Sequence, residues 1–260
     1  MGHKPRKRFG QNFLHDPNVI QRIVDFIDPR EDEHLVEIGP GQGALTAPLL
    51  RGAGRLDVIE LDRDLIPLLQ KKFAGESHFT IHQADALKFD FCSLQATRKL
   101  RIAGNLPYNI STPLLFHLAQ HLDCIEDMHF MLQKEVVERI TARAGDRHYG
   151  RLGIMLGYYC QAECLMTIGP GAFSPPPKVD SAIVRLTPHA APPVQVDELA
   201  MLSKVVTQAF SQRRKTLRNS LKGLLTEADI MALDIDPGLR PEQIPLDQFA
   251  RLANAISKQG

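Results

Sequence analysis

An amide, a proline and an aromatic ring follow one another where a short apolar run ends, in the stretch RIAGNLPYNIS at residues 101–111. The side-chain oxygen of Asn105 could accept a hydrogen bond from an exocyclic amine, and so could a rigid backbone carbonyl, that of Leu106 or Pro107. Two such acceptors favour a tetrahedral nitrogen whose lone pair can attack a methyl group. The ring of Tyr108 could then hold the base that carries the amine. The stretch predicts methylation of a base amine, and the alternative is a plain turn with Tyr108 in the core.

A second aromatic residue, Phe173, comes just before three prolines in the stretch AFSPPPKVDS. Prolines keep this loop out of a helix, so the loop is predicted to present the Phe173 ring to the opposite face of the same base. A hairpin loop usually lies at the surface but can fold back. A core position for the Phe173 ring therefore stays open as an alternative.

A glycine-rich turn in the stretch EIGPGQGALT follows an apolar run near residue 38. Gly39, Gly41 and Gly43 let the backbone approach a ligand without collisions of Cβ atoms. Glu60 ends the next apolar run, about twenty residues on, where a carboxylate can accept hydrogen bonds from both ribose hydroxyls of a nucleoside. Asp85, in HQADAL, ends a third run and could bind an adenine amino group. These residues predict a nucleoside cofactor.

These residues do not decide which nucleoside cofactor binds. The same glycines also fit a degenerate dinucleotide-binding pattern, or simply a tight turn between strand and helix. S-adenosylmethionine carries an adenine without a pyrophosphate. We therefore favour S-adenosylmethionine as the cofactor.

The elements that must position these residues follow from short apolar runs that alternate with helical patterns. The runs are HLVEIG, RLDVIEL, HFTIHQ, KLRIAGN and DMHFML. Such alternation predicts an α/β fold with a doubly wound parallel sheet, in which ligands bind at the carboxyl ends of the strands. The helix in STPLLFHLAQHL is predicted to take Thr112 as its cap. Two further runs after Leu165 predict an antiparallel pair at the sheet's edge.

A proline-rich stretch, PHAAPPVQV, predicts a linker between two domains. We place a cofactor-binding catalytic domain at residues 1–188 and a small helical, RNA-binding domain at residues 196–260. In the second domain, Arg214, Arg218 and Lys222 are predicted to form a row along one helix with no acid in reach, which favours contact with phosphates. The alternative is a solvated face.

Charge and composition limit the classes of protein to which this chain can belong. The 260 residues carry 31 lysines and arginines and 30 acids, but KPRKR at the amino terminus and SQRRKTLRNSLK contain no acid. Charge asymmetry of this kind suggests an anionic partner. No apolar run is long enough to cross a bilayer and no secretory signal begins the sequence, so we expect no membrane association and a cytoplasmic location.

The four cysteines are scattered, which predicts buried, reduced thiols and neither a disulfide framework nor a metal site. They are Cys92, Cys124, Cys160 and Cys164. Nothing in the sequence suggests more than a monomer.

Eight stretches occur in a characteristic order from residue 6 to the carboxyl-terminal helices: RKRFGQNFLHD, EIGPGQGALT, IELDRDL, QADAL, GNLPYNISTPLLFHL, MHFMLQKEVVERI, AFSPPPKVDSAIVRL and SQRRKTLRNSL. Each is modest alone, but together they resemble the bacterial small-subunit ribosomal RNA adenine dimethyltransferases, the KsgA type. The resemblance implies a Rossmann-like class I methyltransferase sheet with a small carboxyl-terminal helical domain. It further implies dimethylation of the N6 amines of two adjacent adenines in the 3′-terminal hairpin loop of 16S rRNA, within the immature 30S subunit.

The resemblance also implies roles for individual residues. Asn12 and Leu14 are expected to contact S-adenosylmethionine, and four further residues are expected to complete its pocket: Gly39, Glu60, Asp85 and Asn105. Three alternatives remain. A DNA amino-methyltransferase would need a large recognition insert for which the chain has no room. The macrolide-resistance methyltransferase of large-subunit RNA shares nearly all motifs, though FHLAQHLDCIEDMHFMLQKEV and AFSQRRKTLRNSL favour the small-subunit enzyme. A non-catalytic nucleic-acid binder is disfavoured by the intact Asn105–Tyr108 stretch.

Overall fold

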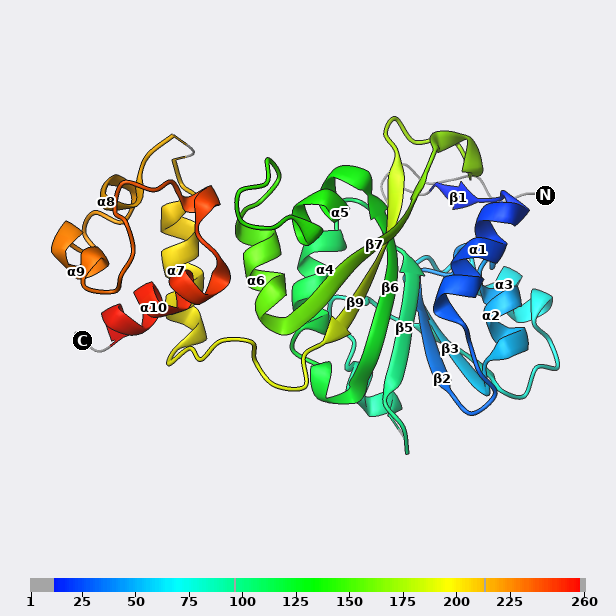
Figure 1. Ribbon diagram of the computed structural model, residues 1–260. Coiled ribbons are helices and arrows are strands. Elements are labelled where there is room, and N and C mark those ends of the chain that lie inside the picture. The colour runs from blue at the N-terminus through cyan, green and yellow to red at the C-terminus, as the bar shows by residue number, and fades with distance from the viewer. Residues whose placement is uncertain (1–11, 96, 213, 258–260) are drawn as a thin grey trace. The chain divides into compact units, whose positions relative to one another are not determined.

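A computed structural model describes residues 12–95, 97–212 and 214–257 (Figure 1). The chain divides into two compact units, the first formed by described residues up to 137 together with 162–188, and the second by 138–161 with the described residues from 189 onward. The first unit ends at residue 188, as the predicted catalytic domain does. Residues 138–161, which we expected in that domain, instead pack with the second unit, because their apolar helix contacts the helices that follow residue 198.

Apart from residues 160–161, which count with the second unit, a seven-stranded sheet with the strand order β4-β3-β2-β5-β6-β9-β7 lies in the first unit. The five strands from β4 to β6 are parallel and β9 runs antiparallel to β6. The strands are β2 (His34–Ile38), β3 (Arg55–Glu60), β4 (Phe79–Gln83), β5 (Leu100–Asn105), β6 (Ile125–Gln133), β7 (Cys160–Ile168) and β9 (Ser181–Pro188). The predicted α/β fold class is confirmed.

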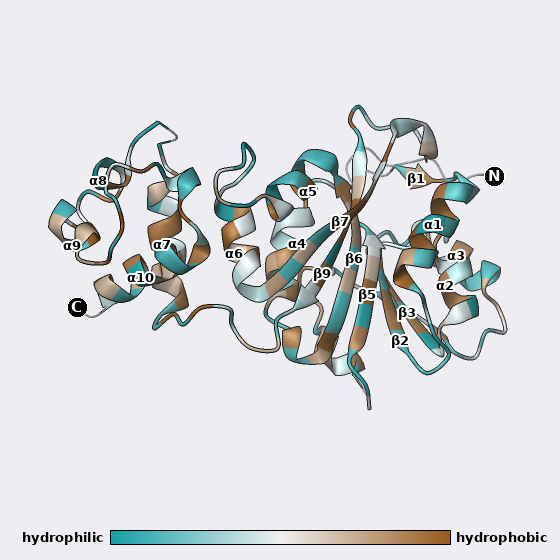
Figure 2. Ribbon diagram, viewed as in Figure 1, coloured by the Kyte–Doolittle hydropathy of each residue, from teal (hydrophilic) through white to brown (hydrophobic). Residues whose placement is uncertain are grey.

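Helices cover both faces of this sheet, with α1 and α4 on opposite sides (Figure 1). Hydrophobic residues concentrate in the strands and alternate with hydrophilic ones along α1 (Figure 2), because only one side of that helix meets the core. The elements are α1 (Pro17–Ile27), α2 (Thr46–Gly52), α3 (Ile66–Lys72), α4 (Ser111–Leu118), α5 (Lys134–Thr141, which spans the boundary between the two units), η2 (Phe91–Leu94), η3 (Leu122–Cys124) and η4 (Pro170–Ala172).

The starts of α1 and α4 differ in how they are capped. Asp16 caps α1, since its carboxylate accepts the backbone N–H groups of Asn18 and Val19. The prediction of Thr112 as the cap of α4 was wrong, because α4 begins at Ser111 and its N-cap, Ile110, makes no side-chain cap bond. A hydroxyl inside the first turn cannot take the place of the residue before the helix.

The second unit is helical, as expected. Its elements are α6 (Arg151–Tyr159), α7 (Leu199–Ala209), α8 (Leu217–Ser220), α9 (Glu227–Met231), η5 (Pro241–Gln243) and α10 (Leu246–Ser257). Helices α7 and α10 pack against each other and both contact α6.

The predicted basic row in this unit is wrong. Helix α8 has only four residues, so Arg214 precedes it and Lys222 follows it. Arg218 Nη1 lies 3.3 Å from Glu227 Oε1, so an acid is within reach. The helix is short because its first backbone N–H groups bond carbonyls of the 237–239 segment, and Gly223, at φ +89°, turns the chain soon after it. The other basic group of the sequence, Lys4 to Arg8, lies outside the described residues.

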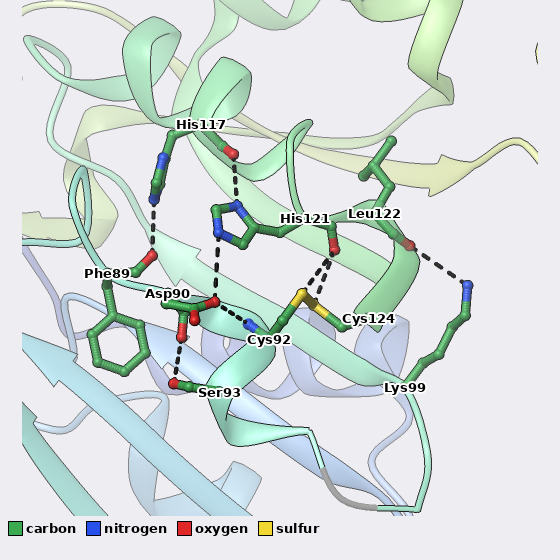
Figure 3. Close-up of a disulfide and its surroundings, with 9 residues drawn as sticks. All are labelled: Phe89, Asp90, Cys92, Ser93, Lys99, His117, His121, Leu122 and Cys124. Carbon is green, nitrogen blue, oxygen red and sulfur yellow. Dashed lines mark hydrogen bonds and ion pairs between the residues drawn. A yellow bond between two sulfur atoms is a disulfide. The ribbon is translucent and has the colours of Figure 1, made fainter.

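The prediction of four buried, reduced thiols is also corrected. Cys92 in η2 and Cys124 in η3 form a disulfide, with Cα atoms 5.4 Å apart (Figure 3). The sequence hides this pair because 32 residues separate the two cysteines and only the packing of η2 on η3 brings them together. Cys160 is free and buried, and burial raises its pKa to about 12. Cys164 is free but exposed.

In the described part of the chain, no helix combines the length and the apolar character that a membrane crossing requires.

Candidate active site

A cavity of about 360 Å³ lies at the carboxyl ends of β2, β3 and β5 and beside the loop that follows β4. This is the edge where parallel α/β sheets bind ligands, because the strand ends and the loops after them diverge there. All six residues predicted to bind the cofactor line the cavity: Asn12, Leu14, Gly39, Glu60, Asp85 and Asn105. The structure thus brings together residues that span 93 positions of sequence.

The glycine-rich turn forms one wall of the cavity. Gly39 and Gly41 have φ angles of +70° and +57°, a region that side chains rarely adopt. The N–H of Gly39 donates to the carbonyl of Ile59 over 2.9 Å, which fixes the turn against the end of β3. A Cβ atom at Gly41 would lie 3.2 Å from the ring of Phe13, so glycine also allows the segment at residues 12–14 to close over the turn.

Glu60 points into the cavity from the end of β3. Its Oε1 accepts the N–H of Asp62 over 2.7 Å and its Oε2 accepts the N–H of Gly41 over 3.3 Å. Burial raises the pKa of Glu60, while these two backbone hydrogen bonds oppose the rise. Each carboxylate oxygen has a second lone pair, so a carboxylate held in this way can still accept from a ligand hydroxyl.

Asp85 is held in a similar way beyond β4. Its Oδ1 accepts the N–H of Leu87 over 3.0 Å, which leaves Oδ2 for a donor in the ligand. The neighbouring Ala84 and Ala86 also line the cavity. This arrangement suits an adenine ring whose amino group donates to the carboxylate.

We expect Glu60→Ala to weaken cofactor binding by roughly tenfold to a hundredfold, because charge-assisted hydrogen bonds to hydroxyls contribute about 1.5–3 kcal/mol. Calorimetry on the protein without RNA measures this directly. The exposed Glu76, in the loop between α3 and β4, gives the matched control, Glu76→Ala, which should bind as the wild type does. Wild-type affinity in Glu60→Ala would move the ribose contact to another residue.

A buried acid that the sequence analysis missed, Glu37, also lines the cavity. Only 2% of this residue is exposed, and Thr46 Oγ1 donates to its Oε2 over 2.6 Å. Burial raises the pKa of Glu37 to about 7; the nearby Glu60 adds to the rise, whereas Thr46 and Lys72 oppose it. The signal in the sequence was an acid between the apolar residues of the strand HLVEI.

From the raised pKa of Glu37 we predict how the stability of the protein depends on pH. A carboxyl whose pKa rises on folding contributes less to the stability of the fold as pH increases. For Glu37 this loss runs from the pKa of the unfolded state, near 4.5, to that of the folded state, about 7. Glu37→Gln keeps an acceptor for Thr46 and removes the charge, so it should raise the free energy of unfolding by about 2 kcal/mol at pH 6 and by little below pH 4. Urea unfolding of the cofactor-free protein at both pH values checks this; an equal effect at both would contradict the assignment.

The predicted amine-binding stretch also lines the cavity, beside the glycine-rich turn. Asn105, Leu106, Pro107 and Tyr108 all line the cavity. Leu106 is anchored by its N–H, which donates to the carbonyl of Met131 over 3.1 Å. Asn105 Nδ2 donates to the carbonyl of Asn12 over 3.1 Å.

The ring of Tyr108 is half-buried, and its hydroxyl lies 3.1 Å from the hydroxyl of the buried Ser181 at the start of β9. This contact ties the stretch after β5 to a strand more than 70 residues further along the chain. The side chain of Tyr108 therefore forms part of the cavity wall and is held in place by Ser181.

Phe173 does not join this wall. Its ring is 3% exposed and packs in the hydrophobic core of the first unit. Its strand, β8 (Phe173–Ser174), pairs with β1 (Phe13–Leu14), and Leu14 belongs to the same hydrophobic core. The expectation of a presented ring is corrected, and the alternative of a core position describes this structure.

Comparison with known proteins decides the class of the chain. The family model described as "Ribosomal RNA adenine dimethylase" matches residues 2–258. The chain belongs to this family. The "Ribosomal RNA small subunit methyltransferase A" of Pseudomonas aeruginosa is 63% identical over 98% of this chain and 96% of that protein.

Solved structures agree with the fold. A dimethyladenosine transferase from Plasmodium falciparum superposes with a TM-score of 0.82 at 26% identity, over 95% of this chain and 98% of that one. The 23S rRNA methyltransferase ErmE gives a TM-score of 0.74, also at 26% identity, over 95% and 100%. The predicted resemblance and the Rossmann-like class I methyltransferase fold are confirmed.

As a member of this family, the chain is a ribosomal RNA methyltransferase with S-adenosylmethionine as its cofactor. The cavity fits that cofactor, because its carboxylates suit hydroxyl and amine donors and its glycine turn allows close approach of the backbone. Among the described residues, no group of three or more acids, histidines or cysteines could hold a metal ion.

Proposed function

We propose that this chain dimethylates the N6 amines of two adjacent adenines in the 3′-terminal hairpin loop of 16S rRNA. The observation that carries the proposal is that the Asn105–Tyr108 stretch shares one cavity with Glu60 and Asp85. A base amine and a nucleoside cofactor can therefore meet there. The relatives named for the small subunit are 56–63% identical to the chain, against 26% for ErmE, which favours the small-subunit substrate.

In this proposal, the cofactor's ribose and adenine are held by residues at or just after the ends of different strands. Glu60 accepts hydrogen bonds from the ribose hydroxyls and Asp85 accepts from the adenine amine. Asn12 and Leu14 cover the cofactor from the amino-terminal side, and Gly39 lets the backbone pass close to it. Four segments that are far apart in the sequence thus set the position of the methyl group.

The target adenine leaves its stack and lies against Tyr108. The side-chain oxygen of Asn105 and the carbonyl of Leu106 accept the two N6 hydrogens, so the nitrogen lone pair points along the line of attack. We favour Leu106 over Pro107 as the second acceptor because the Pro107 carbonyl already accepts the N–H of Ile110 over 3.2 Å.

Transfer forms a bond between N6 and the methyl carbon and breaks the bond from that carbon to sulfur. The methylated nitrogen then loses a proton to water, because the ammonium it forms is acidic and needs no strong base. In the second round the nitrogen carries a single hydrogen, so one of the two acceptors suffices.

The substrate is proposed to be the immature 30S subunit, bound by a single copy of the chain in the cytoplasm. Residues 196–260 are proposed as the RNA-binding domain. Their exposed cations include Arg214, Lys215 and Lys222, which lie in loops and turns around α8.

The experiment is a transfer assay with labelled cofactor on three substrates: immature 30S particles, naked 16S rRNA and naked 23S rRNA. The proposal predicts label in adenines of the 16S 3′-terminal loop, with immature 30S particles labelled faster than the naked RNAs. Faster labelling of 23S rRNA would overturn the substrate assignment. Absence of transfer to any RNA would favour a non-catalytic binder.

A further inference from the structure

The contact between Asn105 and Asn12 settles how the Asn105 amide is oriented. Its Nδ2 lies 3.1 Å from the backbone oxygen of Asn12. A backbone carbonyl can only accept a hydrogen bond, so the group that faces it must be the NH₂ and not the oxygen of the amide. The side-chain oxygen of Asn105 is therefore turned away from Asn12, and Asn105 itself lines the cavity.

This orientation is the one that the chemistry needs. An adenine amine brings two N–H donors and so requires an acceptor opposite them. If the Asn105 amide flipped by half a turn, its NH₂ would face the amine, donor against donor, and its oxygen would face the carbonyl of Asn12, acceptor against acceptor. Both contacts would be repulsive.

The carbonyl of Asn12 is itself held by the strand that follows it. Strand β1 pairs with β8, and the N–H of His15 donates to the carbonyl of Ala172 over 2.9 Å. Leu14 is 6% exposed and packs in the core beside Phe173. Asp16, two residues after Leu14, caps α1, so the segment is anchored by the pairing of β1 with β8 and by the start of α1.

We propose that the backbone carbonyl of Asn12 is a positioning group that holds the Asn105 amide in its reactive orientation, and that the pairing of β1 with β8 keeps this carbonyl in place. This inference rests on the proposed role of Asn105. It gives the buried Phe173 a function as well, since its strand supports the segment that orients the amide. It also explains why an amide, and not a carboxylate, stands at residue 105.

The first test removes one hydrogen bond of the pairing. His15 is exposed, so His15→Pro deletes the N–H that reaches Ala172 while its control, His15→Ala, keeps it. We expect His15→Pro to lower the single-turnover rate at saturating cofactor by about tenfold or more, with RNA affinity unchanged. In ¹⁵N spectra of the same variant, the side-chain NH₂ of Asn105 should exchange faster with water. His15→Ala should match the wild type in both measurements.

The second test changes the side-chain group of residue 105 that faces the carbonyl of Asn12. It does not depend on whether the proline variant folds. In Asn105→Asp, a carboxylate would oppose the carbonyl of Asn12, whereas the protonated acid could donate to it and still offer an oxygen to the amine. We expect transfer by this variant to be as slow as in Asn105→Ala at pH 7.5 and to recover at least about tenfold by pH 5, a profile that the wild type should not show.

The outcomes separate this inference from the proposed function. A wild-type rate in Asn105→Ala would remove the catalytic role of Asn105 itself. A slow Asn105→Ala together with wild-type transfer and amide exchange in His15→Pro would overturn only the positioning role. Full activity of Asn105→Asp at pH 7.5 would also overturn it, since the residue would then need no donor toward Asn12.

Discussion

Asn105→Ala should lower the single-turnover rate of methyl transfer by about a hundredfold or more, because one positioned polar group in a transition state is worth about 3 kcal/mol. Cofactor affinity should change little, since Glu60 and Asp85 supply the proposed hydrogen bonds to the nucleoside. RNA affinity should also persist, because phosphate contacts dominate such binding. The loss therefore falls on the chemical step.

Rapid mixing of an enzyme–cofactor complex with excess 30S particles measures that step without product release. Asn18→Ala is a matched control, because Asn18 is exposed on α1 and its side chain lies outside the cavity lining. An unaffected rate in Asn105→Ala would contradict the assignment of residues 105–108 as the stretch that binds the amine.

The position of the cofactor cavity was predictable because it follows from local rules. Parallel strands end at one edge of a sheet, so residues that end successive apolar runs must gather there. Glu60, Asp85 and Asn105 each end such a run, and all three line the cavity. Asn12 and Leu14 came only from resemblance, since no strand pattern marks them, yet they also lie there.

Features set by long-range packing were not predictable in the same way. Phe173 is buried because β1, about 160 residues earlier, pairs with its strand. The basic residues around α8 lose their helical row because that segment bonds a loop near residue 238. The Cys92–Cys124 disulfide likewise depends on two short helices that meet only in the folded chain. Helical periodicity and residue spacing report on single elements and carry no information on such pairings.

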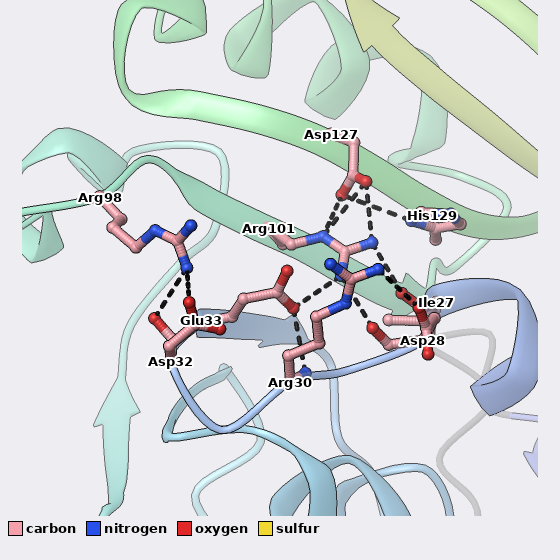
Figure 4. Close-up of polar contacts among 9 residues, drawn as sticks. All are labelled: Ile27, Asp28, Arg30, Asp32, Glu33, Arg98, Arg101, Asp127 and His129. Carbon is pink, nitrogen blue, oxygen red and sulfur yellow. Dashed lines mark hydrogen bonds and ion pairs between the residues drawn. The ribbon is translucent and has the colours of Figure 1, made fainter.

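A buried cation also escaped the sequence analysis, although it stands at the start of the strand that ends in Asn105. Arg101 Nη1 lies 2.8 Å from Glu33 Oε2, and Nη2 lies 2.9 Å from Asp127 Oδ2 (Figure 4). The guanidinium also donates to the carbonyls of Ile27 and Asp28 at the end of α1, over 2.7 and 3.2 Å. Arg101 thereby joins β5, β6 and the chain between α1 and β2.

The pKa of Arg101 is raised despite its burial, because the carboxylates of Asp127 and Glu33 favour the charged form. Burial alone would raise the pKa of Asp127, but His129 and Arg101 lower it overall. A carboxyl with a lowered pKa stabilises the fold above its unfolded pKa, and that stabilisation is lost as pH falls. The network should therefore contribute most at neutral pH.

Arg101→Met is expected to lower the free energy of unfolding by about 3–5 kcal/mol at pH 7, because two nearly buried carboxylates lose their partner. The loss should shrink as pH falls, because the Asp127 carboxyl then takes up a proton and no longer needs the cation. The control is Arg98→Met, since Arg98 pairs with Asp32 at the surface, with 53% and 68% of the two side chains exposed. That variant should cost less than about 1 kcal/mol.

Urea unfolding of both variants at pH 7 and pH 4 provides the measurement, and a loss for Arg101→Met that is equal at the two pH values would contradict the ionic account. The methyl-transfer rate adds a second criterion. Arg101 is not among the residues that line the cavity, so folded Arg101→Met should transfer methyl groups at close to the wild-type rate. Asn105→Ala should show the reverse pattern, a slow reaction in a stable protein, because one end of β5 contributes to stability and the other to chemistry.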